Sequence, residues 1–205
     1  MTTENEGQPI DCPSPFDAAV LADYWIGALA GGEEEAIEEH LLGCDGCGAR
    51  LREIIALAEG IRSLAREGSL RMIVSEIFLK RAAQEGLRVR EYAPPPGGGV
   101  ECTVTAEDRI LIARLAANLS GRNRVDLSIC DDQGVEGLRM RDIPVQAGVG
   151  SILYQESITF AKALPTHKMI ARLVSVDETG AEHLLGEYTF NHTRSLPGPG
   201  LWPPD

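Results

Sequence analysis

Apolar side chains in the first part of the chain recur at the spacing of amphipathic helices. Across residues 16–86 they return every three or four positions, which places them on one face of a helix. Glycines interrupt these runs where helices would end, and three consecutive glutamates open one run, where carboxylates offset the positive end of a helix. We therefore predict four helices. The first ends near Gly27, the second runs from Glu33 past Leu42, the third from Asp45 to Glu67, and the fourth from Ser69 to Gly86.

The pattern changes to short alternating runs around the segment APPPGGG, residues 93–99. Such a segment can neither continue a helix nor sit in a central strand. Turn signals, notably DDQG at 131–134 and DETG at 177–180, separate the runs, and the last two runs are typical of a β-hairpin. Six or seven short strands in about a hundred residues predict an antiparallel sandwich. The predicted strands are 87–92, 100–105, 109–115, 124–130, 151–158, 167–176 and 183–190.

The two patterns together predict an α+β chain of two domains. A helical module with four helices occupies residues 1–86, and an antiparallel β-sandwich occupies residues 87–192. The Pro-rich end, residues 193–205, is predicted to be a flexible tail. A chain of 205 residues is long enough for each domain to bury a core of its own.

Charge is distributed unevenly along the chain. Residues 1–47 carry eleven acidic side chains and no lysine or arginine, whereas residues 48–90 have a net charge of +4 and residues 91–205 a net charge of −5. Phosphates would repel the first quarter, so we expect no direct binding to nucleic acid. The acidic segment suits docking on a basic protein surface, although plain solubility explains it equally well.

The sequence contains no run of eighteen apolar residues, so we expect no membrane span. Residues 1–12 are acidic and lack the basic start and apolar core of a signal peptide. We therefore expect a cytoplasmic protein whose five cysteines stay reduced. In that compartment clustered cysteines more often bind metal than form disulfides.

One cluster has the spacing of metal ligands. His40 and Cys44 are four positions apart and share a helix face, and two residues separate Cys44 from Cys47. Zinc accepts one imidazole with thiolates in a closed tetrahedral site. Cys12 is the only other thiol in the helical module, and a hairpin of the first two helices would bring it back as the fourth ligand. The competing interpretation has buried thiols and a surface histidine; we favour zinc held by Cys12, His40, Cys44 and Cys47.

Residues 21–51, LADYWIGALAGGEEEAIEEHLLGCDGCGARL, resemble the zinc-binding anti-sigma factor domain. That family has a helix ending in a Gly-containing turn, a glutamate-rich start to the next helix, the motif H-x3-C-x2-C and a long third helix. The resemblance covers residues 12–67 well and residues 69–86 more loosely. It implies the same four zinc ligands.

The resemblance also implies a function. Such domains bind an extracytoplasmic-function sigma factor and block its access to RNA polymerase, and their fourth helix commonly inserts between the sigma regions. In some relatives oxidation of ligand thiols expels zinc and releases the sigma factor; the sequence leaves structural and switching roles both open. Many relatives are membrane-anchored after the zinc domain, whereas here any signal would be cytoplasmic.

We expect no enzymatic activity, because no nucleophile–base arrangement or cofactor fingerprint can be defended. The single histidines His167, His183 and His192 lack the H-x-H pair of a cupin, and we expect surface or strand-end residues rather than a second metal site. Cys102 and Cys130 alternate with apolar residues and are expected to face the core.

Two classes of function remain open from the sequence. The chain is a soluble anti-sigma factor with a zinc-held helical module, or it is a ligand-binding or assembly β-sandwich whose zinc module serves only protein–protein interaction. A homodimer and the purpose of the sandwich are left open in both.

Overall fold

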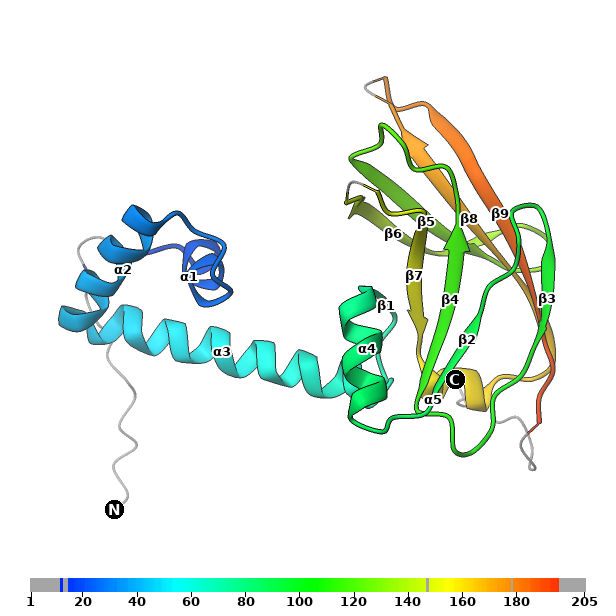
Figure 1. Ribbon diagram of the computed structural model, residues 1–205, viewed down its shortest axis with the longest axis horizontal. Coiled ribbons are helices and arrows are strands. Elements are labelled where there is room, and N and C mark those ends of the chain that lie inside the picture. The colour runs from blue at the N-terminus through cyan, green and yellow to red at the C-terminus, as the bar shows by residue number, and fades with distance from the viewer. Residues whose placement is uncertain (1–11, 13–14, 147, 178, 196–205) are drawn as a thin grey trace, which may run out of the picture. The chain divides into compact units, whose positions relative to one another are not determined.

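The computed structural model of the chain describes residue 12 and residues 15–146, 148–177 and 179–195. These residues form a mixed α+β structure with five helices and two β-sheets (Figure 1). The chain divides into two compact units, Met1–Ser63 and Leu64–Asp205, which are called the amino-terminal unit and the β unit. None of the helices in the described residues combines the length and apolar character needed to cross a membrane.

The amino-terminal unit contains α1 (Ala18–Trp25), α2 (Gly31–Gly43) and most of α3 (Asp45–Arg66). The Asp17 side chain caps α1 by accepting a hydrogen bond from the backbone N–H of Ala19. Gly27, at a φ of +68°, ends that helix as predicted, because glycine adopts this conformation without a steric cost. Leu21, Ile37 and Cys47, one from each helix, are almost completely buried and form the small core of the unit.

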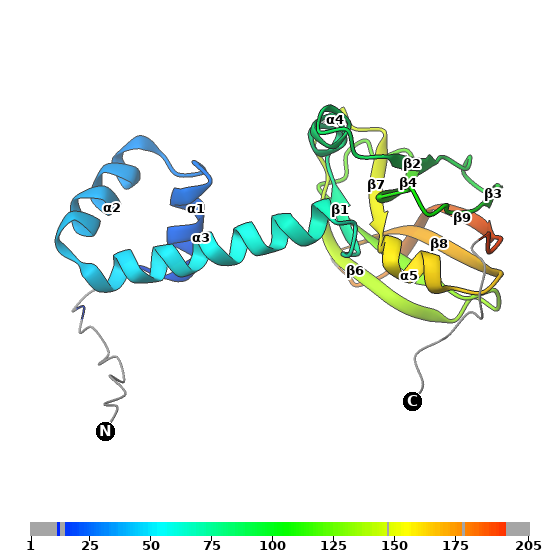
Figure 2. The same ribbon diagram turned by 90° about the horizontal axis from the view of Figure 1, so that it is seen from below.

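The prediction of a fourth helix in this unit is not confirmed. Residues 72–74 form the strand β1 (Met72–Val74), and α4 begins only at Glu76, where the Ser75 side chain caps it, and ends at Gln84. Leu79 and Ala82 of α4 pack against residues of the four-stranded sheet, and the helix lies on the outer side of that sheet (Figure 2). The helix predicted over residues 69–86 is therefore too long. The apolar residues that suggested it belong to two elements, a short strand followed by a short helix.

The β unit contains two sheets. The four-stranded sheet has the order β1-β7-β4-β2, and the five-stranded sheet has the order β3-β9-β8-β5-β6. A short helix, α5 (Ile158–Ala163), follows β7. The strands are β2 (Val89–Tyr92), β3 (Gly99–Cys102), β4 (Ile110–Ala116), β5 (Arg124–Cys130), β6 (Glu136–Pro144), β7 (Ser151–Glu156), β8 (His167–Val176) and β9 (Glu182–His192).

The two sheets share one hydrophobic core. Leu115 and Tyr154 from the four-stranded sheet belong to the same buried cluster as Leu127, Leu173 and Tyr188 from the five-stranded sheet. Alternating side chains of each strand point into this cluster, as the alternation in the sequence predicts. The hairpin of β8 and β9 is confirmed, with an antiparallel register that runs from His167 opposite His192 to Val176 opposite Glu182.

The prediction of a purely antiparallel sandwich was wrong. β2 pairs with β4 in parallel, and β3 pairs with β9 in parallel, so both sheets are mixed. The Pro/Gly segment explains the difference: it carries the chain from β2 in one sheet to β3 in the other, and β4 then returns beside β2. An edge strand shows the same alternation of apolar and polar residues whether its neighbour runs parallel or antiparallel to it. The sequence pattern therefore does not indicate the direction of the neighbouring strand.

The division between the compact units lies within α3, at residues 63 and 64, whereas the sequence placed the domain boundary at residue 86. Gly68 illustrates why the segment after α3 belongs with the sheets. Its φ is +71°, and a Cβ atom there would lie 2.0 Å from the backbone oxygen of Arg109 at the start of β4. Of the predicted tail, residues 196–205 lie outside the described residues.

Candidate metal centre

The junction between α2 and α3 positions three of the predicted ligands. His40 lies in the last turn of α2, Cys44 is the residue between the helices, and Cys47 lies in the first turn of α3. The Sγ atom of Cys44 accepts a hydrogen bond of 3.5 Å from the backbone N–H of Cys47, and the Cys44 carbonyl accepts one of 3.0 Å from Gly48. Cys44 therefore occupies the N-cap of α3, a place usually taken by serine or aspartate.

The four side chains meet at one point. The Nε2 atom of His40 lies 3.5 Å from Sγ of Cys12 and 3.2 Å from Sγ of Cys47, and these two sulfurs are 4.0 Å apart. Together with Sγ of Cys44, all four ligand atoms lie within 4.8 Å of one another. Elsewhere in the described residues no other group of three or more Cys, His, Asp or Glu side chains has this arrangement.

These separations fit a tetrahedral ion. With Zn–S bonds of about 2.3 Å and Zn–N bonds of about 2.05 Å, the edges of a tetrahedron are about 3.8 Å between sulfurs and about 3.6 Å between sulfur and nitrogen. The distance of 4.0 Å between the sulfurs of Cys12 and Cys47 and that of 3.5 Å from Cys12 to His40 are close to those edges. The four residues can therefore hold a metal ion.

Two contacts from outside the cluster position the segment that carries Cys12. The ring of Phe16 meets the ring of His40 edge to face, with the centroids 5.0 Å apart. The Arg50 guanidinium on α3 donates a hydrogen bond of 2.9 Å to the backbone carbonyl of Phe16. No spacing rule points to either residue, and sequence reasoning did not identify them.

The start of α3 favours the ionised form of one thiol. The hydrogen bond from the backbone N–H of Cys47 is the largest influence on Cys44 and lowers the pKa of its thiol to about 7. A thiolate is the form that binds metal, and the backbone N–H groups at a helix start stabilise negative charge. Cys47 is only 1% exposed, so the cluster is closed on that side.

The cysteines and histidines that were not predicted as ligands lie in the β unit. Cys102 is half-buried and packs against the shared core as expected, and burial raises the pKa of its thiol to about 11. Cys130 is buried, but its Sγ atom contacts Ser128 and Arg172 and the residue is not part of the shared core cluster, so the expectation of a core-facing side chain is wrong for it. His183 is exposed and pairs with Asp177. His167 begins β8 and His192 ends β9, so both occupy strand ends as expected. His192 is nevertheless only 7% exposed, because residues of α5 and of both sheets surround it.

Large apolar side chains on the amino-terminal unit face solvent. Leu57 and Ile61, one turn apart on α3, are 66% and 46% exposed, and Leu42 at the end of α2 is 91% exposed. Trp25 is held under the Arg62 guanidinium, 4.4 Å from the ring centroid, so it is not part of this set. Large exposed apolar side chains of this kind are typical of a docking surface.

Comparison with known proteins adds no assignment. No protein-family profile and no curated protein matches the chain. One of the solved structures that match is that of the domain CBM51-2 in complex with GlcNAc, and of INT domains, from Clostridium perfringens ZmpB, at 13% sequence identity and a TM-score of 0.28. The match covers 86% of this chain and 51%, about half, of that one. A TM-score of this size establishes no common fold.

Proposed function

We propose that this protein is a zinc-binding anti-sigma factor that sequesters an extracytoplasmic-function sigma factor and so represses transcription. The observation that carries the proposal is the convergence of Cys12, His40, Cys44 and Cys47 at the junction of α2 and α3. The same four positions are the ligands that the resemblance to the anti-sigma zinc domain implies. Three thiolates and one imidazole make a soft, closed ligand set, which suits zinc in a structural site.

Zinc would act by holding the helices in one arrangement. The core of the amino-terminal unit is small, and only Leu21, Ile37 and Cys47 are almost completely buried in its described part. A unit of that size gains much of its folding free energy from a bound metal. Binding of zinc would therefore fix α1, α2 and the start of α3 around the ion.

The exposed apolar side chains on these helices are the proposed contact with the sigma factor. Leu57 and Ile61 on α3 and Leu42 on α2 offer apolar area to a partner, and α2 carries five glutamates. A basic sigma factor surface would be attracted to that charge, and the apolar residues would supply the buried centre of the interface.

The proposal is tested by co-purifying the full chain with each candidate extracytoplasmic-function sigma factor from its own genome. We expect a stable complex on size-exclusion chromatography that contains one zinc ion per chain by elemental analysis and dissociates when a chelator removes the metal. Zinc-loaded protein that forms no complex at micromolar concentration would contradict the proposal. That result, combined with intact zinc binding, would favour the alternative in which the zinc unit serves only assembly and the β unit binds a ligand.

A further inference from the structure

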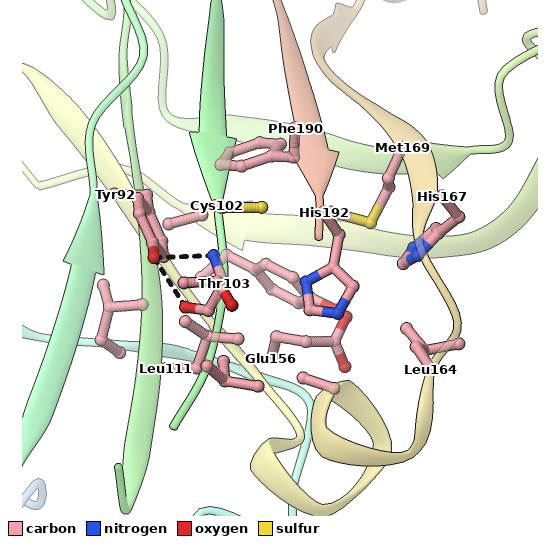
Figure 3. A pocket seen from close by; sticks show the side chains of 15 residues that line it. Tyr92, Cys102, Thr103, Leu111, Glu156, Leu164, His167, Met169, Phe190 and His192 are labelled. Atoms are coloured by element: carbon pink, nitrogen blue, oxygen red, sulfur yellow. Dashed lines mark hydrogen bonds between the residues drawn. The ribbon is translucent and has the colours of Figure 1, made fainter. Parts of the chain in front are cut away.

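The β unit contains a partly open cavity of about 50 Å³, lined by residues of both sheets. The lining includes Ile112 and Tyr154 of the four-stranded sheet, Phe190 and Met169 of the five-stranded sheet, and Ala161 of α5. Figure 3 shows the side chains of Phe190 and Met169 beside this space. The described residues that line the cavity are therefore mainly apolar. The side chains around an empty space of this kind lack packing contacts on one side, which a bound molecule would supply.

His192 places an unpaired polar atom in this apolar space. The residue is 7% exposed, its ring projects into the cavity, and its Nε2 atom has no hydrogen-bond partner in the described part of the chain (Figure 3). Burial, with smaller effects from the nearby charges of His167 and Arg194, lowers the pKa of His192. The imidazole is therefore neutral near pH 7. A buried polar atom without a partner costs about 1–3 kcal/mol, which a hydrogen bond from a ligand would offset.

The tyrosine hydroxyls and the carboxylate of the cavity wall have partners. The Tyr92 hydroxyl donates to the carbonyl of Thr103 at 2.6 Å and accepts from the N–H of the same residue at 2.9 Å. The Glu156 carboxylate pairs with Arg71 at 2.6 Å and accepts a hydrogen bond of 2.9 Å from the Tyr154 hydroxyl. Among the described residues of this wall, Nε2 of His192 is the fully buried side-chain nitrogen or oxygen without a hydrogen-bond partner.

A metal ion is not the occupant that this arrangement favours. His192 lies opposite His167 on β8 and opposite Cys102 on β3, so three side chains that can bind metals occupy neighbouring strands. Nevertheless, among the described residues only the cluster of Cys12, His40, Cys44 and Cys47 brings ligand atoms close enough together to hold an ion. The raised pKa of Cys102 also keeps its thiol protonated near neutral pH.

We propose that this cavity binds a small neutral organic molecule with a short apolar body and one hydroxyl or carbonyl group, which hydrogen-bonds to Nε2 of His192. The volume of about 50 Å³ is a third of the roughly 150 Å³ that accommodates benzene, so about two non-hydrogen atoms fit inside and the rest of a larger ligand extends toward the open side of the cavity. A charged ligand would lose its hydration in an apolar space whose one carboxylate, Glu156, is already paired. This site lies wholly in the β unit and does not depend on the proposed zinc or sigma factor binding.

The experiment compares two probes of similar size on the full chain. 1-Propanol carries the hydroxyl group, and 1-chloropropane replaces it with a group that hydrogen-bonds weakly. The methyl resonance of Met169 reports on the cavity, and that of Met140 on β6, which does not line it, is the internal control. We expect 1-propanol to shift the Met169 signal with a saturating titration curve, to leave the Met140 signal unchanged, and to bind more tightly than 1-chloropropane.

Two substitutions distinguish the contribution of the hydrogen bond to binding from the contribution of the cavity volume. His192→Phe keeps a ring but removes Nε2, and should weaken 1-propanol binding about two- to tenfold while leaving 1-chloropropane binding unchanged. The matched control is His183→Phe on the same strand, where the side chain is exposed, and it should alter neither affinity. Ala161→Leu should fill the cavity and abolish the binding of both probes. Titrations that do not saturate, equal shifts at Met140, or equal affinities of the two probes for the unaltered chain would overturn the proposal.

Discussion

The guanidinium of Arg50 donates a hydrogen bond of 2.9 Å to the backbone carbonyl of Phe16, 34 positions earlier in the chain. Phe16 follows Cys12 closely and packs edge to face on His40, whereas Arg50 lies one turn after Cys47 on α3. This single contact therefore joins the segment that carries the first ligand to the helix that carries the last one.

Replacing Arg50 should weaken metal binding without removing a ligand. In Arg50→Ala the segment around Cys12 loses its attachment to α3, so ordering Cys12 costs more conformational entropy when the ion binds. We expect the dissociation constant for zinc to rise about two- to tenfold, the range that the loss of one exposed hydrogen bond allows. Competition with a chromophoric chelator measures it. Arg52→Ala, which removes the same charge two positions later, is the control, and an equal change in both variants would contradict the assigned role.

Replacing Cys47 should remove the metal and the structure that it stabilises. Cys47→Ser places a poorer zinc ligand at the most buried position of the cluster, 1% exposed. Since a structural zinc ion contributes its binding free energy to folding, we expect loss of tightly held zinc and of most helical signal from the amino-terminal unit. Elemental analysis and far-ultraviolet circular dichroism report the two losses. Cys102→Ser in the β unit should retain the zinc, and a Cys47→Ser chain that keeps one ion per molecule would refute the ligand assignment.

The proposed docking surface predicts a loss of partner binding that leaves the metal in place. Leu57→Asp and Ile61→Asp each put a carboxylate where the interface would be buried, which should weaken sigma factor binding by more than about tenfold. Leu184→Asp, at a position on β9 with 59% exposure, is the matched control in the β unit. Isothermal titration calorimetry with the sigma factor measures the affinity. Unchanged affinity in both α3 variants, with zinc retained, would locate the interface elsewhere.

A buried carboxylate connects two strands at the edge of the four-stranded sheet. Asp108 is completely buried; it accepts hydrogen bonds of 2.5 Å from Arg90 and 2.8 Å from the N–H of Thr105, and forms an ion pair with Arg88. Asp108→Ala should destabilise the β unit by about 1–3 kcal/mol, because it removes the acceptor for the Arg90 guanidinium and the Thr105 N–H. Hydrogen exchange of peptides from β2 and β4 measures the change. Asp132→Ala, in an exposed turn, should have almost no effect.

The same carboxylate predicts a loss of stability in acid. Burial by itself opposes ionisation of Asp108, but the hydrogen bonds from Arg90 and Thr105 outweigh it and lower the pKa. Because the folded-state pKa is below the unfolded value of about 3.9, the stabilisation is complete above that value and is lost as the pH falls through the folded pKa. The urea midpoint of the β unit should therefore fall below about pH 4. The urea midpoint should depend less on pH in the Asp108→Asn variant than in the unaltered protein. The same change of midpoint with pH in both proteins would contradict this account.

The sequence by itself determined the features that depend on local chemistry. The spacing of His40, Cys44 and Cys47 follows from one helix turn and one short junction, so it identified a candidate metal group that the structure brings together. Helical periodicity predicted α1, α2 and α3 to within a few residues, and strand alternation predicted the hairpin of β8 and β9. These patterns are readable because each element orders its own side chains through backbone geometry.

Only the tertiary structure decided what lies beside each element. The parallel pairing of β2 with β4, the packing of α4 on a sheet, and the burial of His192 all depend on neighbours distant in sequence. Periodicity records that one face of an element is buried but not which element covers it. The contact of Arg50 with Phe16 belongs to the same class, because a hydrogen bond between a side chain and a distant carbonyl leaves no pattern along the chain.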